Sequence, residues 1–320
     1  MLRLFKQSAP VQIAAIIIAA ALLWVRAFIE PVPMAPEHHF APIYWLFYSW
    51  LSMSPRLASA VALVFVVAEG LWLNIILVDH KAARANSLMP TLLYLLTMGW
   101  NAADLTITPI LLVNIMVIAA FSQLLSGGAT SLSASRNFNA AFCIGMAALC
   151  YMPALSYILP FLFVFIIYKL YRWRDVVVSL LGLVAPSIVF LTYAFIKDRL
   201  QYDLILISHD FLDVNIMWNH TPVVETICAV VFVVIFVLAL LYTLTNMNEK
   251  MIQQRINNGV LSLPILAAIV IMLMSRITPL NTQLLAPTFA FTASHYLYAD
   301  RKKAWIGEAI FWTIVVASII

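Results

Sequence analysis

Charged residues are scarce in this sequence of 320 residues, where Asp, Glu, Lys and Arg together make up 10%. A soluble domain usually carries about 25% of these residues, and a chain with so few cannot cover a water-facing surface. A soluble globule, a disordered chain and a nucleic-acid-binding protein are therefore excluded. Apolar residues make up 64% and the mean hydropathy is +0.98, which predicts an integral membrane protein surrounded by membrane lipids.

Cysteine and glycine are also rare, with three and eight copies against fifteen prolines. Cys143, Cys150 and Cys228 lie in apolar segments without a CxxC or Cys/His pattern, so we expect no disulfide, metal site or redox centre. The sequence does not identify a cofactor. The glycines form no GxxxG pair, which argues against close glycine-mediated helix packing throughout the protein.

Apolar runs separated by charge and proline predict an all-α bundle of about eleven transmembrane helices in a single integral membrane domain, residues 1–320. The run 11–29 is longer than the core of a signal peptide, about 7–15 residues, and no cleavage site follows it. We therefore expect it to remain as the first span. The predicted spans are 11–29, 57–79, 88–100, 107–125, 138–151, 154–171, 176–196, 222–245, 259–275, 281–298 and 303–320.

Two predicted spans, 88–100 and 138–151, have only 13 and 14 residues. A helix of that length rises about 20 Å, less than the hydrocarbon thickness of about 30 Å. Each segment therefore crosses a thinned region or stops partway. Helices that stop at membrane depth are shielded by protein or face a water-filled cavity, although an ordinary short buried helix explains the length equally well.

The distribution of Lys and Arg predicts which side of the membrane each loop faces. With the N-terminus inside and eleven crossings, 13 of the 18 basic residues lie on the inner side and five on the outer side, as the positive-inside rule requires. Removal of one short span would move every later loop to the opposite side of the membrane, and the basic residues would no longer be concentrated on the inner side. Removal of a pair of spans would preserve this distribution, so nine spans is the alternative.

The first predicted outer loop, 30–56, carries Glu30 and Glu37 ahead of an aromatic stretch, Ile43–Leu51. That stretch is too short to span a membrane and predicts a helix lying in the interface. The two histidines that follow Glu37 are adjacent, so they cannot both point at one ligand from a helix. This argues against a metal site there.

The second predicted outer loop, 197–221, has apolar residues at alternating spacings of four and three. This spacing places them on one face of a helix, with Asp203 and Asp210 at its edge and on its polar side. Two outer loops with interfacial helices and acidic residues are suited to cap a cavity that opens to the outer leaflet.

The charged residues of the outer side are candidates for transfer chemistry on a lipid phosphate substrate. A carboxylate can act as a general base or hold a divalent cation, and arginine can bind a phosphate through two hydrogen bonds. The alternative is that outer loops contain acids only because Lys and Arg are selected to the inner side. The candidate catalytic residues are Glu30, Glu37, Asp203 and Asp210, and the candidate substrate-binding residues are Arg26, Arg56, Arg199 and Arg276.

Glu69 lies in the middle of the apolar run 57–79. An ionisable group at that depth indicates a functional site by default, so Glu69 is a further candidate for substrate binding. It would act as a proton relay or a cargo ligand, or it would be a protonated carboxyl that serves packing. Its candidate partners are Asn74, Asn114 and His295.

Four stretches between residues 85 and 197 carry a resemblance to known proteins: ANSLMPTLLYLL, FNAAFCIGMAALCYMPAL, the basic turn YKLYRWRD and SLLGLVAPSIVF. Over about a third of the chain the sequence resembles an uncharacterised family of bacterial polytopic inner-membrane proteins. The resemblance implies a multi-pass protein of the bacterial inner membrane.

More distantly, the layout is similar to that of multi-spanning glycosyltransferases and polysaccharide polymerases that use polyprenyl-phosphate sugars. In those enzymes a carboxylate in the first outer loop, followed by an interfacial helix, acts near the lipid donor. The resemblance implies that Glu30 or Glu37 occupies that place, although the family pattern has Asp and a companion motif that this chain lacks.

Three functional hypotheses follow. The first is a transferase or polymerase of the cell envelope that acts on a polyprenyl-phosphate-linked glycan at the outer face of the membrane. The second is a transporter or lipid flippase that uses Glu69, although the sequence shows no inverted repeat of the kind many transporters contain. The third is a non-catalytic subunit of a membrane-protein complex in the envelope.

Overall fold

The computed structural model describes residues 9–37, 40–83, 87–100, 105–126, 133–168, 173–212, 223–245, 252–274, 283–297 and 304–319. Within these ranges the chain is helical and contains no strand. The helices are α1 Ala9–Ile29, α2 Pro42–Leu51, α3 Pro55–Asp79, α4 Met89–Met98, α5 Pro109–Leu125, α6 Ala134–Cys150, η3 Met152–Tyr157, α7 Ile158–Ile167, α8 Trp173–Ile196, α9 Leu200–Leu212, α10 Val223–Thr245, α11 Ile252–Ser262, α12 Pro264–Met274, η5 Gln283–Leu285, α14 Ala286–Leu297 and α15 Ala304–Ile319.

Each of the eleven predicted apolar segments coincides with helix in the structure, so the all-α class is confirmed. Among the described residues, five helical stretches are long and apolar enough to cross a membrane. Three predicted spans are divided: 154–171 contains the end of η3 and α7, 259–275 contains the end of α11 and α12, and 281–298 contains η5 and α14. The second division falls before Pro264, whose nitrogen has no hydrogen to donate. The apolar helices are compatible with an integral membrane protein.

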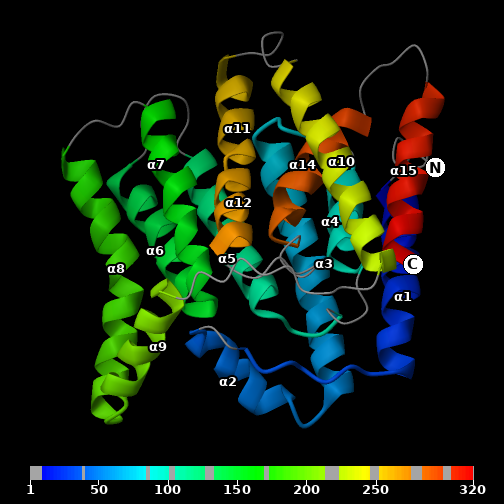
Figure 1. Cartoon of the computed structure of the whole chain (residues 1–320). Coiled ribbons are helices and arrows are strands. Elements are labelled where there is room, and N and C mark those ends of the chain that lie inside the picture. The colour runs from blue at the N-terminus through cyan, green and yellow to red at the C-terminus, as the bar shows by residue number, and fades with distance from the viewer. Residues whose placement is uncertain are drawn as a thin grey trace.

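The two predicted outer loops lie at the same end of the molecule. In Figure 1, α2 lies at the lower end, where α1 ends and α3 begins, and α9 lies at that end beside the lower part of α8. The outward face of α2 is apolar, because Leu46 and Trp50 are 67% and 76% exposed. A water-facing helix would not present these side chains, so this face suits contact with lipid.

Helix α4 is short and central. All ten of its residues are buried, and it packs against α1, α3, α14 and α15. Ten residues rise about 15 Å, which is half of the hydrocarbon thickness. In Figure 1, α4 and its neighbour α14 both end well above the lower ends of α1 and α3. The predicted short span 88–100 is thus a half-length helix shielded by protein on every side.

The other predicted short span is longer than expected. Helix α6 begins at Ala134, four residues before the predicted start, because the Ser133 hydroxyl accepts a hydrogen bond from the amide of Arg136 and caps the helix. Its 17 residues rise about 25 Å, close to the thickness of the membrane core.

The composition argues against close glycine-mediated packing throughout the protein, but such packing does occur between α6 and α8. Helices α6 and α8 make the most extensive helix pair in the described structure. Gly182 of α8 faces the backbone of Phe138 in α6, and Gly145 of α6 faces the backbone of Leu183 in α8. The glycines lie on two different helices, so no GxxxG pattern within one helix reports the contact.

Candidate functional site

The first candidate site is the extended segment between α1 and α2, which crosses the lower end of the molecule. The Tyr44 hydroxyl donates a hydrogen bond to the carbonyl of Ala35 over 2.5 Å. The carbonyl of Phe40 accepts a bond of 3.1 Å from the amide of Met152, and the Phe40 ring packs edge-on against Phe190 at 5.3 Å. These contacts fix a non-helical segment against α2, η3 and α8.

Glu37 lies within this fixed segment and is half-buried. Burial raises the pKa of the neighbouring Tyr44 well above its ordinary value, and the negative charge of Glu37 raises it further. The Tyr44 hydroxyl therefore remains a hydrogen-bond donor throughout the physiological range, and it keeps the segment that carries Glu37 in place.

The other predicted outer-side residues are dispersed around the lower end. Glu30, Arg26 and Arg56 are exposed where α1 ends and α3 begins, and Arg199 is exposed at the start of α9. In Figure 1, α1 and α9 lie on opposite sides of this end. The structure therefore places Arg26 and Glu30 at the end of α1, Arg56 at the start of α3 and Arg199 just before α9.

Helix α9 buries Asp203 and exposes the two apolar residues that follow it. Asp203 is 8% exposed, whereas Leu204 and Ile205 are 46% and 65% exposed, and the helix contacts α8 and η3. The side chain of Asp210 and the whole of Arg276 lie outside the described residues. Among the residues that the structure does describe, His, Cys, Asp and Glu form no group of three or more that could hold a metal ion.

The second candidate site surrounds Glu69, in the middle of α3. Glu69 is 2% exposed, and its Oε2 accepts a hydrogen bond from the hydroxyl of Tyr94 in α4. Its Oε1 has no hydrogen-bond partner among the described residues. One residue along, the carbonyl of Gly70 accepts a bond of 2.9 Å from the Thr91 hydroxyl, so α4 contacts α3 through two polar side chains.

A polar clasp joins the end of α4 to the start of α14. The Gln283 side-chain amide donates to the carbonyl of Met98 over 3.1 Å. The Asn114 side-chain amide in α5 donates to the carbonyl of Gln283 over 3.2 Å and contacts the Met98 sulfur at 3.5 Å. The clasp, defined as Met98, Asn114 and Gln283, thus includes Met98, which lies four residues after Tyr94 in α4.

The partner of Glu69 differs from those that the sequence indicated. Asn114 bonds to Gln283 in the clasp, while His295 packs edge-on against Phe291 with ring centroids 5.1 Å apart. The Asn74 Oδ1 atom is buried without a partner in the described structure. Tyr94 was missed because a tyrosine in an apolar run resembles a packing residue until the neighbouring helix is known.

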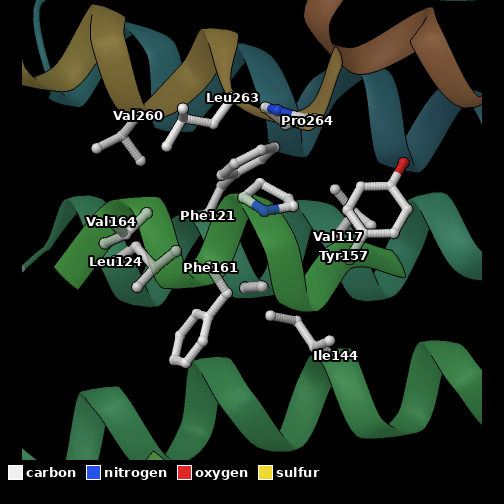
Figure 2. A pocket seen from close by; sticks show the side chains of 12 residues that line it. Val117, Phe121, Leu124, Ile144, Tyr157, Phe161, Val164, Val260, Leu263 and Pro264 are labelled. Atoms are coloured by element: carbon white, nitrogen blue, oxygen red, sulfur yellow. The ribbon is translucent and has the colours of Figure 1, made fainter. Parts of the chain in front are cut away.

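A small apolar cavity lies between α5, α6, α7 and the junction of α11 with α12 (Figure 2). Its volume is about 20 Å³, enough for about one water molecule, and too small for a substrate. Figure 2 shows the Tyr157 ring at one end of the cavity, with its hydroxyl pointing away from the other lining side chains. That hydroxyl is buried and has no partner among the described residues.

Comparisons with protein families, with curated proteins and with solved structures gave no match for this chain.

Proposed function

We propose that this protein is a multi-pass protein of the bacterial inner membrane that transfers or polymerises lipid-linked glycans at the outer face. The observation that carries the proposal is the fixed, half-buried position of Glu37 in an extended segment beside α2. A general base needs a defined position but must be reachable by substrate. Glu37 meets both needs, whereas fully buried Glu69 does not.

The chemistry assigned to Glu37 is that of a general base. Its carboxylate would take the proton from an acceptor hydroxyl while the oxygen forms a bond to the anomeric carbon of the donor sugar. The bond between that carbon and the phosphate oxygen breaks, and polyprenyl phosphate leaves with the electron pair. The exposed guanidinium groups of Arg26 and Arg56, near the same loop, are suited to bind the phosphate.

The side of the membrane that each end of the molecule faces follows from the distribution of Lys and Arg among the loops. The end of the molecule that holds α2 and α9 is assigned to the outer face and the N-terminus to the cytoplasm. Helix α4 is too short to cross alone, which favours an arrangement in which α4 and α5 form a hairpin that enters and leaves on one side. Nine crossings then remain, and every later loop keeps its side.

The test uses purified protein in liposomes with a labelled polyprenyl-phosphate sugar and a glycan acceptor. Glu37→Gln keeps the shape of the side chain but removes the base, so transfer should fall by about 10²-fold or more. Glu30→Gln tests the alternative carboxylate of the same loop. Glu308→Gln, in the distant helix α15, is the matched control and should retain full activity.

The outcomes separate the three hypotheses. Loss in Glu37→Gln or Glu30→Gln alone supports the transferase. Normal envelope glycans in cells that carry either variant would contradict it. A phenotype confined to Glu69→Gln would instead favour a carrier, and tolerance of all three substitutions would favour a non-catalytic subunit.

A further inference from the structure

Glu69 occupies the part of α3 that is furthest from water. The helix has 25 residues, and Glu69 lies ten residues from its end at Asp79, which is about 15 Å along the axis. This is the middle of the hydrocarbon region for a helix that crosses it. The side chain is 2% exposed, so neither lipid headgroups nor bulk water neutralise a charge there.

The helices that pack most closely on α3 bring no described cation to this carboxyl. Helix α5 has no titratable side chain, α4 has only Tyr94, and α14 has His295 and Tyr296 in its last turn. Arg26 lies in the last turn of α1, and Tyr44 and Tyr48 lie in α2. Arg56, on α3 itself, is 13 residues from Glu69, which is about 20 Å along the helix. A permanent carboxylate would be an uncompensated buried charge, so the neutral acid is the resting form.

The hydrogen bond from Tyr94 opposes the preference of Glu69 for its neutral form. The Tyr94 hydroxyl donates to Oε2, and a donor to a carboxylate stabilises its charged form. Burial therefore favours the neutral form of Glu69, while the hydrogen bond from Tyr94 lowers the cost of the charged form.

Oε1 is the atom at which a proton can reside. It is buried and has no partner in the described part of the chain, while Oε2 is occupied by Tyr94. The buried hydroxyls of Tyr157 and Thr288 also have no partner there. Thr288 lies in the first turn of α14, the end that the clasp joins to α4. Of these, Thr288 lies in a helix that contacts α3, and unpartnered buried polar atoms in contacting helices indicate bound water.

We propose that Glu69 is a proton-binding site inside the membrane, with Tyr94 as its positioning residue. On release, the O–H bond of the Glu69 carboxyl breaks, the proton passes to a water molecule and the electron pair stays on the carboxylate. On uptake these changes are reversed. This inference requires no glycan substrate, so it stands or fails separately from the proposed transferase activity.

The test uses a lipid-soluble carbodiimide, which reacts with protonated carboxyls in apolar surroundings. The acid O–H adds across one C=N bond of the reagent, and the O-acylisourea rearranges to a stable N-acylurea. The full-length protein in lipid nanodiscs is treated between about pH 5 and pH 10 and analysed by peptide mass spectrometry. We expect Glu69 to be labelled at low pH and progressively less at high pH. A water-soluble carbodiimide should label exposed Glu30 and leave Glu69 unmodified.

The infrared band of a protonated carboxyl provides the second readout. It should be present in the wild type, decline over the same pH range as the labelling, and be absent from Glu69→Gln. Because this variant exchanges a neutral acid for a neutral amide of the same shape, it should fold as the wild type does.

Tyr94→Phe tests the positioning role and leaves the acid in place. Without the donor, the carboxylate is less favoured, so half-labelling should move up by about one pH unit or more, a tenfold change in proton concentration. Tyr193→Phe, at an exposed position on α8, should cause no shift. Labelling of Glu69 that does not change with pH would show a permanent packing acid and overturn the proposal. Absence of both label and band would show a permanent carboxylate and overturn it as well.

Discussion

A Cβ atom on Gly182 of α8 would lie 2.5 Å from the carbonyl oxygen of Phe138 in α6. Real Cβ atoms do not approach a backbone oxygen so closely, and a backbone cannot move aside as a side chain does. Gly145 makes the reciprocal contact with the backbone of Leu183. The two glycines therefore set the separation of the most extensively packed helix pair in the described structure.

Gly182→Ala should lower the free energy of unfolding by about 1–3 kcal/mol, the usual cost of overpacking. The measurement is reversible unfolding in mixed micelles. Gly259→Ala is the matched control, because its Cβ would meet its nearest neighbour, the Ile167 side chain, at 3.9 Å, an ordinary contact. Equal stability of the two variants would contradict the close approach of α6 and α8.

The clasp joins residues that are far apart in the sequence, and it should contribute to the stability of the folded protein. Asn114→Leu removes the hydrogen bond to Gln283, a residue 169 positions away, and should lower the free energy of unfolding by about 1–2 kcal/mol. Thr313→Val removes only a bond to the carbonyl of Ile310 within an exposed turn and should cost less than about 0.5 kcal/mol. A smaller loss in Asn114→Leu than in this control would contradict the assigned role.

His80, just beyond the end of α3, should make stability depend on pH. Burial lowers the pKa of His80 below its ordinary value of 6.5, and the charge of Asp79 only partly opposes this. As the pH falls below about 6.5, His80 therefore binds a proton in the unfolded chain before it does so in the folded protein. The folded state loses stability between that pH and the lower pKa of His80 in the folded protein. His80→Gln should reduce the decline in unfolding temperature from pH 7 to pH 5. Lys81→Gln, a substitution at the next position that leaves His80 in place, should leave this decline unchanged.

The two ends of α3 should face opposite sides of the membrane. Met53 is 91% exposed just before the helix, and Lys81 follows its other end. In intact cells a membrane-impermeant maleimide should label Met53→Cys, while Lys81→Cys should react only after permeabilisation. Labelling of both variants from the same side would show that α3 does not cross, and the assigned sidedness would be wrong.

The helices could be predicted from sequence because a membrane demands long apolar runs that charge and proline interrupt. The segment 57–79 differs from α3 by only two residues at its start. The internal breaks were harder to predict. The 3-10 turn η3 begins just before Pro153 and leads directly into α7, so it interrupts an apolar run without any change in polarity.

The candidate site was only partly predictable. Glu69 could be identified because an acid in an apolar run is costly wherever the helix packs. Tyr94 could not, because the sequence does not state which helices meet or at what height. Asp203 shows the same limit: it lies among apolar residues of α9, and only the packing of that helix on α8 and η3 reveals that the acid is buried and its neighbours are exposed.

The burial of α4 has a consequence for synthesis. Its neighbours α14 and α15 are translated long after it, and the clasp joins Met98 to a residue 185 positions further along the chain. Until α14 and α15 insert, the side of α4 that packs against them is not covered by protein. Their insertion therefore completes the burial of α4, and a chain that stops before α14 should be recognised and degraded by membrane proteases.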